Sequence, residues 1–197
     1  LNLLNQYIQQ KSKARIVHFG SAGEYGKLNF APKENIALKP LSTYQYSKAL
    51  ASILISLISI KFHIPIIILR CYSIYGPFEN SNKYIPKLIR HFEKNEKLNI
   101  YQGSQDYFYI DNLGEIILNL LKNKKKFSKN VKIINVGSGN SFSNISVYKI
   151  FEKIYKKKGR AKNILKYQKK TDNKIWICNN KKLKSMKMFK KISLIKG

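Results

Sequence analysis

The chain has 197 residues, of which 44% are hydrophobic and 12% aromatic, and this composition excludes intrinsic disorder for most of its length. Only two cysteines occur, without a Cys-x-x-Cys pair, which excludes a disulfide scaffold and a cysteine-based zinc site. The longest apolar stretch, 49–60, is too short to cross a membrane, so we expect a cytoplasmic protein with no membrane partner.

The net charge of +28 is distributed unevenly along the chain. Residues 1–121 carry 14 basic and 8 acidic side chains, a net +6, whereas 122–197 carry 24 and 2, a net +22. A charge of this size is typical of nucleic-acid-binding proteins. However, 34 of the 38 basic residues are Lys, and Arg is the residue that reads base edges. We therefore expect no nucleic-acid partner, and a basic nucleic-acid-binding protein remains the competing class.

The first part of the chain predicts a parallel α/β sheet. Apolar residues in the first eight positions, spaced like one helical face, predict an opening helix. Residues 15–20 read as a strand buried on both faces, followed by an apolar helix over 44–62 and a β-branched strand over 64–70. Strand, helix and strand in this order predict a right-handed parallel crossover.

Beyond Gly76 the predicted elements become shorter. In chain order we expect a helix over 84–95, strands over 98–101 and 107–110, a helix over 112–122, a strand over 131–136 and a final helix over 146–157. The chain starts with Leu and stops abruptly at Gly197, so we expect a piece of a longer protein.

Unusual residues occur where the two predicted strands end, which is the edge of a parallel sheet where ligands bind. The loop over 20–26 reads Gly-Ser-Ala-Gly-Glu-Tyr-Gly, and the loop over 71–77 reads Cys-Tyr-Ser-Ile-Tyr-Gly-Pro. Tyr44 and Lys48 lie four apart at the start of the helix between them, so both project from one face. An ammonium beside a phenol favours the phenolate, which suits general acid–base chemistry.

Five segments, in order, resemble the motifs of the extended short-chain dehydrogenases/reductases, the NAD-dependent epimerase/dehydratase family that acts on nucleotide sugars. The motifs are a Ser or Thr in a small-residue loop ending in Tyr-Gly, Tyr-x-x-x-Lys, Arg-x-x-Asn-x-Tyr-Gly-Pro, Arg-Asp-aromatic-x-Tyr-Val-Asp-Asp and Asn-x-Gly-x-Gly. Their counterparts here are 21–26, 44–48, 70–77, 105–112 and 135–139.

The resemblance implies a fold and two domains. We expect a partial Rossmann-like, doubly wound parallel sheet with a small C-terminal α/β substrate-binding lobe. Residues 1–80 would form the C-terminal part of the NAD(P)-binding domain. Residues 81–197 would form mainly the nucleotide-sugar-binding lobe, with some segments returning to the sheet.

The resemblance also implies roles for individual residues. Tyr44 would be the general acid/base on a sugar hydroxyl or ketone, Ser21 would hydrogen-bond the same oxygen, and Lys48 would bind the nicotinamide ribose. The cofactor, NAD or NADP, would lie against Tyr44, Lys48 and the segment from Tyr72 through Ser73 to Ile74. The substrate, a nucleotide sugar, would contact Ser73, Gln105 and Lys169, with its diphosphate held by the basic second half of the chain. No metal site is expected.

Several departures from the family pattern narrow the expected reaction. The cofactor-binding Gly-x-x-Gly-x-x-Gly turn does not occur in the sequence, and Ser73 and Gln105 replace the usual Asn and Arg. Sugar 4,6-dehydratases carry an acidic pair directly after the loop Ser/Thr, where Ala22 and Gly23 stand here. Glu24 comes one position late, and we interpret it as a loop carboxylate.

Dehydration is therefore disfavoured, and we expect a nucleotide-sugar epimerase or 4-keto-sugar reductase that transfers hydride at sugar C4 in surface polysaccharide synthesis. The alternative is a truncated, inactive remnant. A homodimer through the opening helix and the helix over 44–62 is a further expectation from the resemblance.

Overall fold

The computed structural model describes residues 2–12, 14–123, 131–157, 166–168, 176–187 and 194. The elements, in chain order, are α1 (Asn2–Gln9), β1 (Ile16–Ser21), the 3₁₀ turn η1 (Ala22–Tyr25), α2 (Thr43–Phe62), β2 (Ile66–Cys71), β3 (Ser73–Tyr75), α3 (Tyr84–Lys94), β4 (Asn99–Tyr101), β5 (Ser104–Gln105), β6 (Tyr107–Tyr109), α4 (Ile110–Lys122), β7 (Lys132–Val136), β8 (Phe142–Ser143), α5 (Asn144–Lys157), β9 (Lys166–Gln168) and α6 (Lys181–Ser185).

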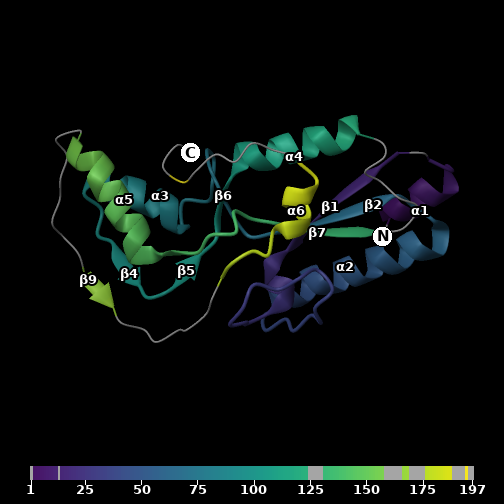
Figure 1. Ribbon diagram of the computed structural model, residues 1–197, viewed down its shortest axis with the longest axis horizontal. Helices are drawn as coiled ribbons and strands as arrows, with labels where there is room; N and C mark the ends of the chain where they lie inside the picture. The colour runs from purple at the N-terminus through teal and green to yellow at the C-terminus, as the bar shows by residue number, and fades with distance from the viewer. Residues whose placement is uncertain are drawn as a thin grey trace.

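The main sheet consists of three parallel strands in the order β1-β2-β7 (Figure 1). Its central strand β2 is buried on both faces, as its β-branched sequence predicts. The expectation for β1 was wrong in this respect, because that strand is only half-buried and Phe19 is 43% exposed. Within the described residues β1 pairs with β2 alone. It is therefore the edge strand of this sheet, and no further strand shields its other side.

Helices cover both faces of this sheet, which confirms the expected fold class. Ile66 and Ile68 point to the face that α1 and α2 cover. The alternate residues Ile67 and Leu69 point to the opposite face, where they pack with α4 and Leu183 of α6. The order β1, α2, β2 also confirms the predicted parallel crossover.

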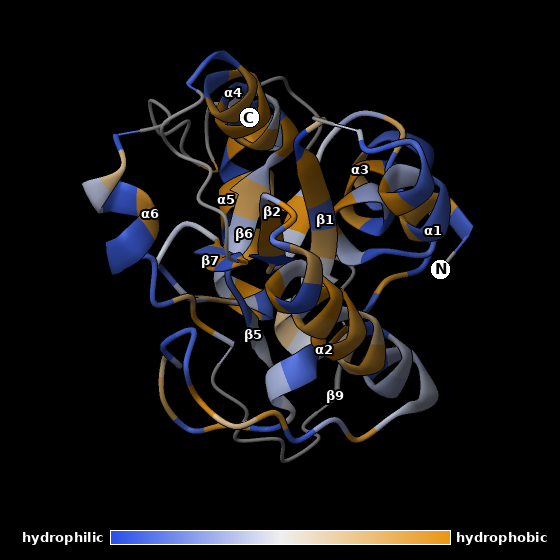
Figure 2. Ribbon diagram, turned by 90° about the vertical axis from the view of Figure 1, so that its right-hand side faces the viewer, coloured by the Kyte–Doolittle hydropathy of each residue, from blue (hydrophilic) through white to orange (hydrophobic). Residues whose placement is uncertain are grey.

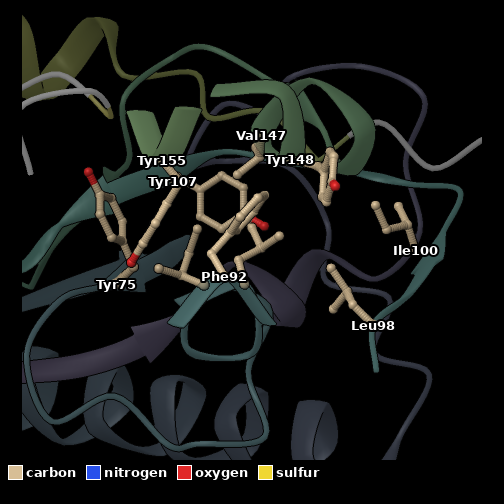
Figure 3. Close-up of a cluster of buried hydrophobic side chains, with 10 residues drawn as sticks. Tyr75, Phe92, Leu98, Ile100, Tyr107, Val147, Tyr148 and Tyr155 are labelled. Atoms are coloured by element: carbon tan, nitrogen blue, oxygen red, sulfur yellow. The ribbon is translucent and has the colours of Figure 1, made fainter. Parts of the chain in front are cut away.

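A second hydrophobic core lies in a lobe beside the sheet, at the left of Figure 1, formed by α3, α5 and short strands. Figure 3 shows its aromatic centre, where the rings of Phe92 and Tyr155 stack with centroids 4.9 Å apart. Tyr107 and Tyr75 pack there edge to face, with 6.0 Å between their ring centroids. These aromatic side chains stabilise the contact between α3, α5 and the strands β3 and β6.

The long elements begin and end near their predicted boundaries, whereas several short ones had no signal. Helix α4 begins at Ile110, two residues before its predicted start. The strands β3, β5, β8 and β9 and the helix α6 were not expected, and the helix over 146–157 is not the last one. Strands of two or three residues are too short for their alternation to be recognised in a sequence.

In the described part of the chain, no helix combines the length and apolarity needed to span a membrane. The same residues contain no group of three or more His, Cys, Asp or Glu side chains arranged to hold a metal ion.

Candidate active site

The carboxyl end of β1 leads directly into a tight, capped turn. Ser21 is the N-cap of η1, and its Oγ accepts a hydrogen bond from the backbone N–H of Gly23 at 3.1 Å. In return, Oε1 of Glu24 accepts a hydrogen bond from the N–H of Ser21 at 2.8 Å, which completes a capping box. This reciprocal pair fixes the backbone of the loop that presents Ser21.

The interpretation of Glu24 as a loop carboxylate was wrong, because its side chain is completely buried. Its Oε2 accepts a hydrogen bond from Nε of Arg70 at 2.8 Å, and its Oε1 accepts one from the hydroxyl of Ser52 in α2 at 3.0 Å. A buried carboxylate is stable only when it is paired in this way. Glu24 thus connects the Ser21 loop, α2 and the end of β2.

Arg70 extends this buried network to the fifth sequence motif. Its Nη1 donates to the hydroxyl of Tyr25 at 2.9 Å, and that hydroxyl donates to Oδ1 of Asn135 at 2.7 Å. Burial raises the pKa of Tyr25, and the neighbouring Arg70 charge opposes the rise. The phenol therefore remains protonated and keeps its donor role toward Asn135.

Helix α2 presents the predicted acid/base pair at its first turns. Ser42 caps the helix by accepting a hydrogen bond from Gln45 N–H at 3.4 Å, so α2 begins directly before Tyr44. The Tyr44 side chain is 60% exposed, and Nζ of Lys48 lies 6.0 Å from the centroid of its ring. Nζ also donates to the carbonyl of Phe19 in β1 at 3.1 Å, which anchors the ammonium at the sheet edge.

One cleft of about 900 Å³ brings most of the predicted site residues together. Its lining includes Ser21, Tyr44, the segment 72–74 and Gln105. Lys48 does not line the cleft. Its hydrogen bond to the carbonyl of Phe19 holds its ammonium group beside Tyr44, which does line the cleft. Lys169 lies outside the described residues.

Two of the residues expected to contact substrate, Ser73 and Gln105, are hydrogen-bonded to each other. The hydroxyl of Ser73 donates to Oε1 of Gln105 at 2.6 Å, joining the loop after β2 to strand β5. Among the described residues, the cleft is lined by two basic side chains, Lys27 and Lys83, which both belong to the less charged first part of the chain. We expected the basic second half of the chain to supply the positive charge of the cleft. Within the described residues, no basic side chain from that half lines it.

Three residues that line the cleft each have a buried side-chain oxygen that lacks a hydrogen-bond partner among the described residues. These oxygens are Oε2 of Glu79, the hydroxyl of Tyr107 and Oδ1 of Asn144. Burial raises the pKa of Glu79, and the charge of Lys83 opposes the rise. Unsatisfied polar groups are costly in a folded protein, so these three oxygens are candidates for hydrogen bonds to a ligand in the cleft.

Asp106 supports the site without lining the cleft, and the sequence did not reveal this role. Its buried carboxylate accepts hydrogen bonds from the backbone N–H groups of Ser138 at 2.7 Å, Gly139 at 2.9 Å and Cys178 at 2.8 Å. Burial raises its pKa, and these backbone bonds oppose the rise. The carboxylate thereby holds the segment 176–180, which leads into α6, beside the cleft.

That stretch contributes Trp176, which sequence reasoning also missed. The indole lines the cleft and lies 5.8 Å from the ring of Tyr72, measured between centroids. The only signal in the sequence was that the chain contains a single tryptophan. Its position follows from the bond between Cys178 and Asp106, which connects residues far apart in the chain.

Comparison with known proteins identifies relatives of this chain in sequence pattern and in architecture. The pattern of the NAD dependent epimerase/dehydratase family matches residues 1–137. An uncharacterised UDP-glucose epimerase of Bacillus subtilis (strain 168) is 27% identical over 157 residues, which cover 78% of this chain and 49% of that protein. A dTDP-D-glucose 4,6-dehydratase of Dictyostelium discoideum is 30% identical over 125 residues, which cover 62% of this chain and 28% of that protein.

Solved structures agree with the fold. UDP-glucuronic acid 4-epimerase from Bacillus cereus, in complex with NAD, has a TM-score of 0.83 at 26% identity and covers 99% of this chain and 62% of its own. The dTDP-glucose 4,6-dehydratase from Bacillus anthracis, in complex with NAD, has a TM-score of 0.85 at 22% identity, with 99% and 62% covered. The chain spans half or less of the two curated relatives. The family resemblance that the five sequence motifs indicated is confirmed: the chain belongs to the NAD dependent epimerase/dehydratase family.

Proposed function

We propose that this chain carries the acid–base and substrate-binding residues of an NAD- or NADP-dependent nucleotide-sugar epimerase or 4-keto-sugar reductase. The observation that carries the proposal is the common cleft that Ser21, Tyr44 and the segment 72–74 line, with Lys48 beside Tyr44. The two proposed domains would be 1–80 and 81–197, the second including the segments that return to the sheet.

The cleft suits a nicotinamide nucleotide on its Tyr44 side. The ammonium of Lys48 has three donors, and one is used by the carbonyl of Phe19, which leaves two for the ribose hydroxyls. The exposed phenol of Tyr44 lies beside it, and the segment 72–74 would border the nicotinamide. When bound, the cofactor accepts or supplies a hydride at the sugar carbon.

The proton chemistry belongs to this chain's own side chains. Tyr44 would take the proton of the sugar hydroxyl as hydride leaves the same carbon, and would return it when the ketone is reduced. Ser21 would hydrogen-bond the reacting oxygen through its Oγ, which the capped turn η1 holds in place. The Lys48 charge would stabilise the negative charge that develops on the phenol oxygen.

Substrate binding draws on the other end of the cleft. The unpartnered Glu79 Oε2 and Asn144 Oδ1 are acceptors suited to sugar and ribose hydroxyls, and the Tyr107 hydroxyl can serve as donor or acceptor. Lys27 and Lys83 would offset the charge of the diphosphate.

Two contacts favour epimerisation or reduction over 4,6-dehydration. Ala22 is buried in a cluster with Tyr72 and Cys178, so an acidic side chain at this position would have to displace packed neighbours. A Cβ on Gly23 would lie 3.0 Å from Gln45 Cγ and 3.2 Å from Ser21 Oγ, and would press on the loop serine itself. Glu24 is committed to Arg70 and Ser52, so it does not replace the missing acids.

Product analysis tests this choice of reaction. The full chain, with NAD, is incubated with UDP-glucose and separately with dTDP-glucose, and the products are identified by proton NMR. We expect the C4 epimer, or with NADPH and a 4-keto sugar the reduced sugar. A 4-keto-6-deoxy product would show a dehydratase, and the absence of any turnover and of nucleotide-sugar binding would contradict the proposal as a whole.

A homodimer is also part of the proposal. Helix α2 is largely hydrophobic (Figure 2), and apolar side chains on its outer face remain exposed, namely Leu50, Ile53, Leu54, Leu57 and Ile60. An exposed apolar strip on a regular helix is suited to packing against the same strip of a second copy.

A further inference from the structure

Trp176 occupies a defined position in the cleft, held from several sides. Its indole packs against the buried cluster of Ala22, Tyr72 and Cys178, and it is tilted by 57° against the Tyr72 ring. The backbone two residues later is held by the Cys178–Asp106 hydrogen bond of 2.8 Å. The side chain of Asn180 adds a hydrogen bond of 3.0 Å to the carbonyl of Gly137. The indole is therefore held in a fixed place beside the cleft.

The indole is only half-buried, so part of it remains available to a ligand. It lines the main cleft together with Ser21 and Tyr44, and it also borders a very small cavity of about 10 Å³ next to Tyr25 and Pro32. That small cavity has no room for a ligand group, so a ligand meets the indole from the main cleft.

We propose that Trp176 is a substrate-binding residue that stacks on the C–H face of the sugar ring of a nucleotide sugar. This inference rests on the proposed function. The face of an aromatic ring carries negative partial charge, and the C–H groups of a pyranose form a flat, weakly positive and apolar surface that packs well on it. Burial of both surfaces adds a hydrophobic contribution.

The sugar ring is the part of the substrate that this position favours. Trp176 packs on Ala22, which follows Ser21, and on Tyr72, which opens the segment proposed to border the nicotinamide. These contacts locate the indole next to the residues proposed to act on the reacting carbon. The Tyr72 phenol is held neutral because burial raises its pKa, so the two rings together form an uncharged aromatic surface.

Intrinsic fluorescence tests this inference directly, because Trp176 is the one tryptophan in the sequence. The full chain is titrated with UDP-glucose and, as a control without sugar, with UDP, while calorimetry records binding of each. We expect UDP-glucose to shift the emission and to protect it from acrylamide quenching, whereas bound UDP leaves both nearly unchanged. Emission that responds equally to bound UDP and bound UDP-glucose would overturn the inference.

Variants give an independent measurement. Trp176→Ala should bind UDP-glucose roughly three- to tenfold more weakly, with unchanged binding of UDP, and Trp176→Phe, which keeps an aromatic face, should retain most of the affinity. If Trp176→Ala does not fold, the Trp176→Phe affinity and the wild-type fluorescence decide.

The outcomes also separate this inference from the proposed function. UDP-glucose that binds wild type and Trp176→Ala equally would overturn the stacking role and leave the proposed function intact. Failure of the wild type to bind UDP-glucose and dTDP-glucose alike would overturn both.

Discussion

Nε of Arg70 donates a hydrogen bond of 2.8 Å to Oε2 of Glu24, and both side chains are almost completely withdrawn from solvent. The pair joins the end of β2 to the loop after β1, and Ser52 connects it to α2. The three segments that carry the proposed acid–base and cofactor-binding residues therefore meet at one ion pair. This arrangement explains how side chains from distant parts of the sequence keep a fixed mutual position.

Removing one partner of this pair should strongly destabilise the fold. Arg70→Met leaves the Glu24 carboxylate buried without its counter-charge, and we expect the free energy of unfolding to fall by about 3–5 kcal/mol in urea denaturation. Arg90→Met, which removes a half-exposed ion pair with Glu96 at 2.7 Å, should cost less than about 1 kcal/mol. Equal losses for the two variants would show that burial of the Glu24–Arg70 pair has no special effect.

Tyr44 is the residue whose loss should stop turnover while the fold remains. Tyr44→Phe removes only the hydroxyl of a side chain that is 60% exposed, and we expect the rate to fall by about 10²–10⁴-fold with unchanged thermal stability. Tyr46→Phe, an exposed tyrosine on the same helix, is the matched control and should keep its activity. Full activity of Tyr44→Phe would refute the acid–base assignment.

The turn at Gly26 should not accept a side chain. Its φ of 71° lies in the left-handed region, and an added Cβ would collide with the backbone carbonyl of Lys39. We expect Gly26→Ala to lower the free energy of unfolding by at least about 2 kcal/mol. A Cβ added at Gly114 in α4 would meet no atom within 4 Å, so Gly114→Ala should raise the free energy of unfolding by about 0.5–1 kcal/mol. Denaturant titration of both variants gives the comparison, and a Gly26→Ala variant as stable as wild type would contradict this geometry.

The two cysteines should be unreactive in the native protein. Burial raises the pKa of Cys71 to about 12, and it raises that of Cys178 as well. A thiol with a pKa of about 12 is thiolate in only about one molecule in ten thousand at pH 8, and the thiolate is the reactive form. Mass spectrometry after iodoacetamide treatment at pH 8 should detect no adduct before denaturation and two adducts afterwards. Rapid native labelling of either thiol would show that the side chain is more accessible than its burial indicates.

The apolar face of α2 should control the oligomeric state. Leu57→Glu introduces a charge into the proposed contact, and we expect light scattering to show conversion of a dimer to a monomer. Leu118→Glu is the control, because Leu118 is 57% exposed, close to the 59% of Leu57, but lies on α4. A wild-type protein that remains monomeric at micromolar concentration would exclude this contact.

Much of the fold is predictable from the sequence, because its long elements depend on local patterns. The buried run 66–69 and the apolar helix before it are enough to indicate a parallel crossover. The five motifs likewise indicate the family, and four of them contribute lining residues to one cleft.

The remaining features depend on long-range contacts that no local pattern records. Glu24 looks like a loop residue because Arg70 and Ser52, which bury it, are 46 and 28 residues away. Trp176 reaches the cleft through the hydrogen bond between Asp106 and Cys178 and through its packing on Tyr72, which lie far from it in the sequence. The hydrogen bond between Ser73 and Gln105 has no local signal either, because 32 residues separate the two side chains in the sequence.

The three backbone hydrogen bonds that Asp106 accepts also impose an order on biosynthesis. The donor at Cys178 is translated 72 residues after the carboxylate, so at typical rates of 5–20 residues per second the growing chain waits about 4–14 s for it. During that interval the Trp176 side of the cleft does not yet exist. A nascent chain that is paused before Cys178 therefore lacks the hydrogen bond that fixes the segment carrying Trp176, and this side of the cleft is completed only when synthesis has passed that residue.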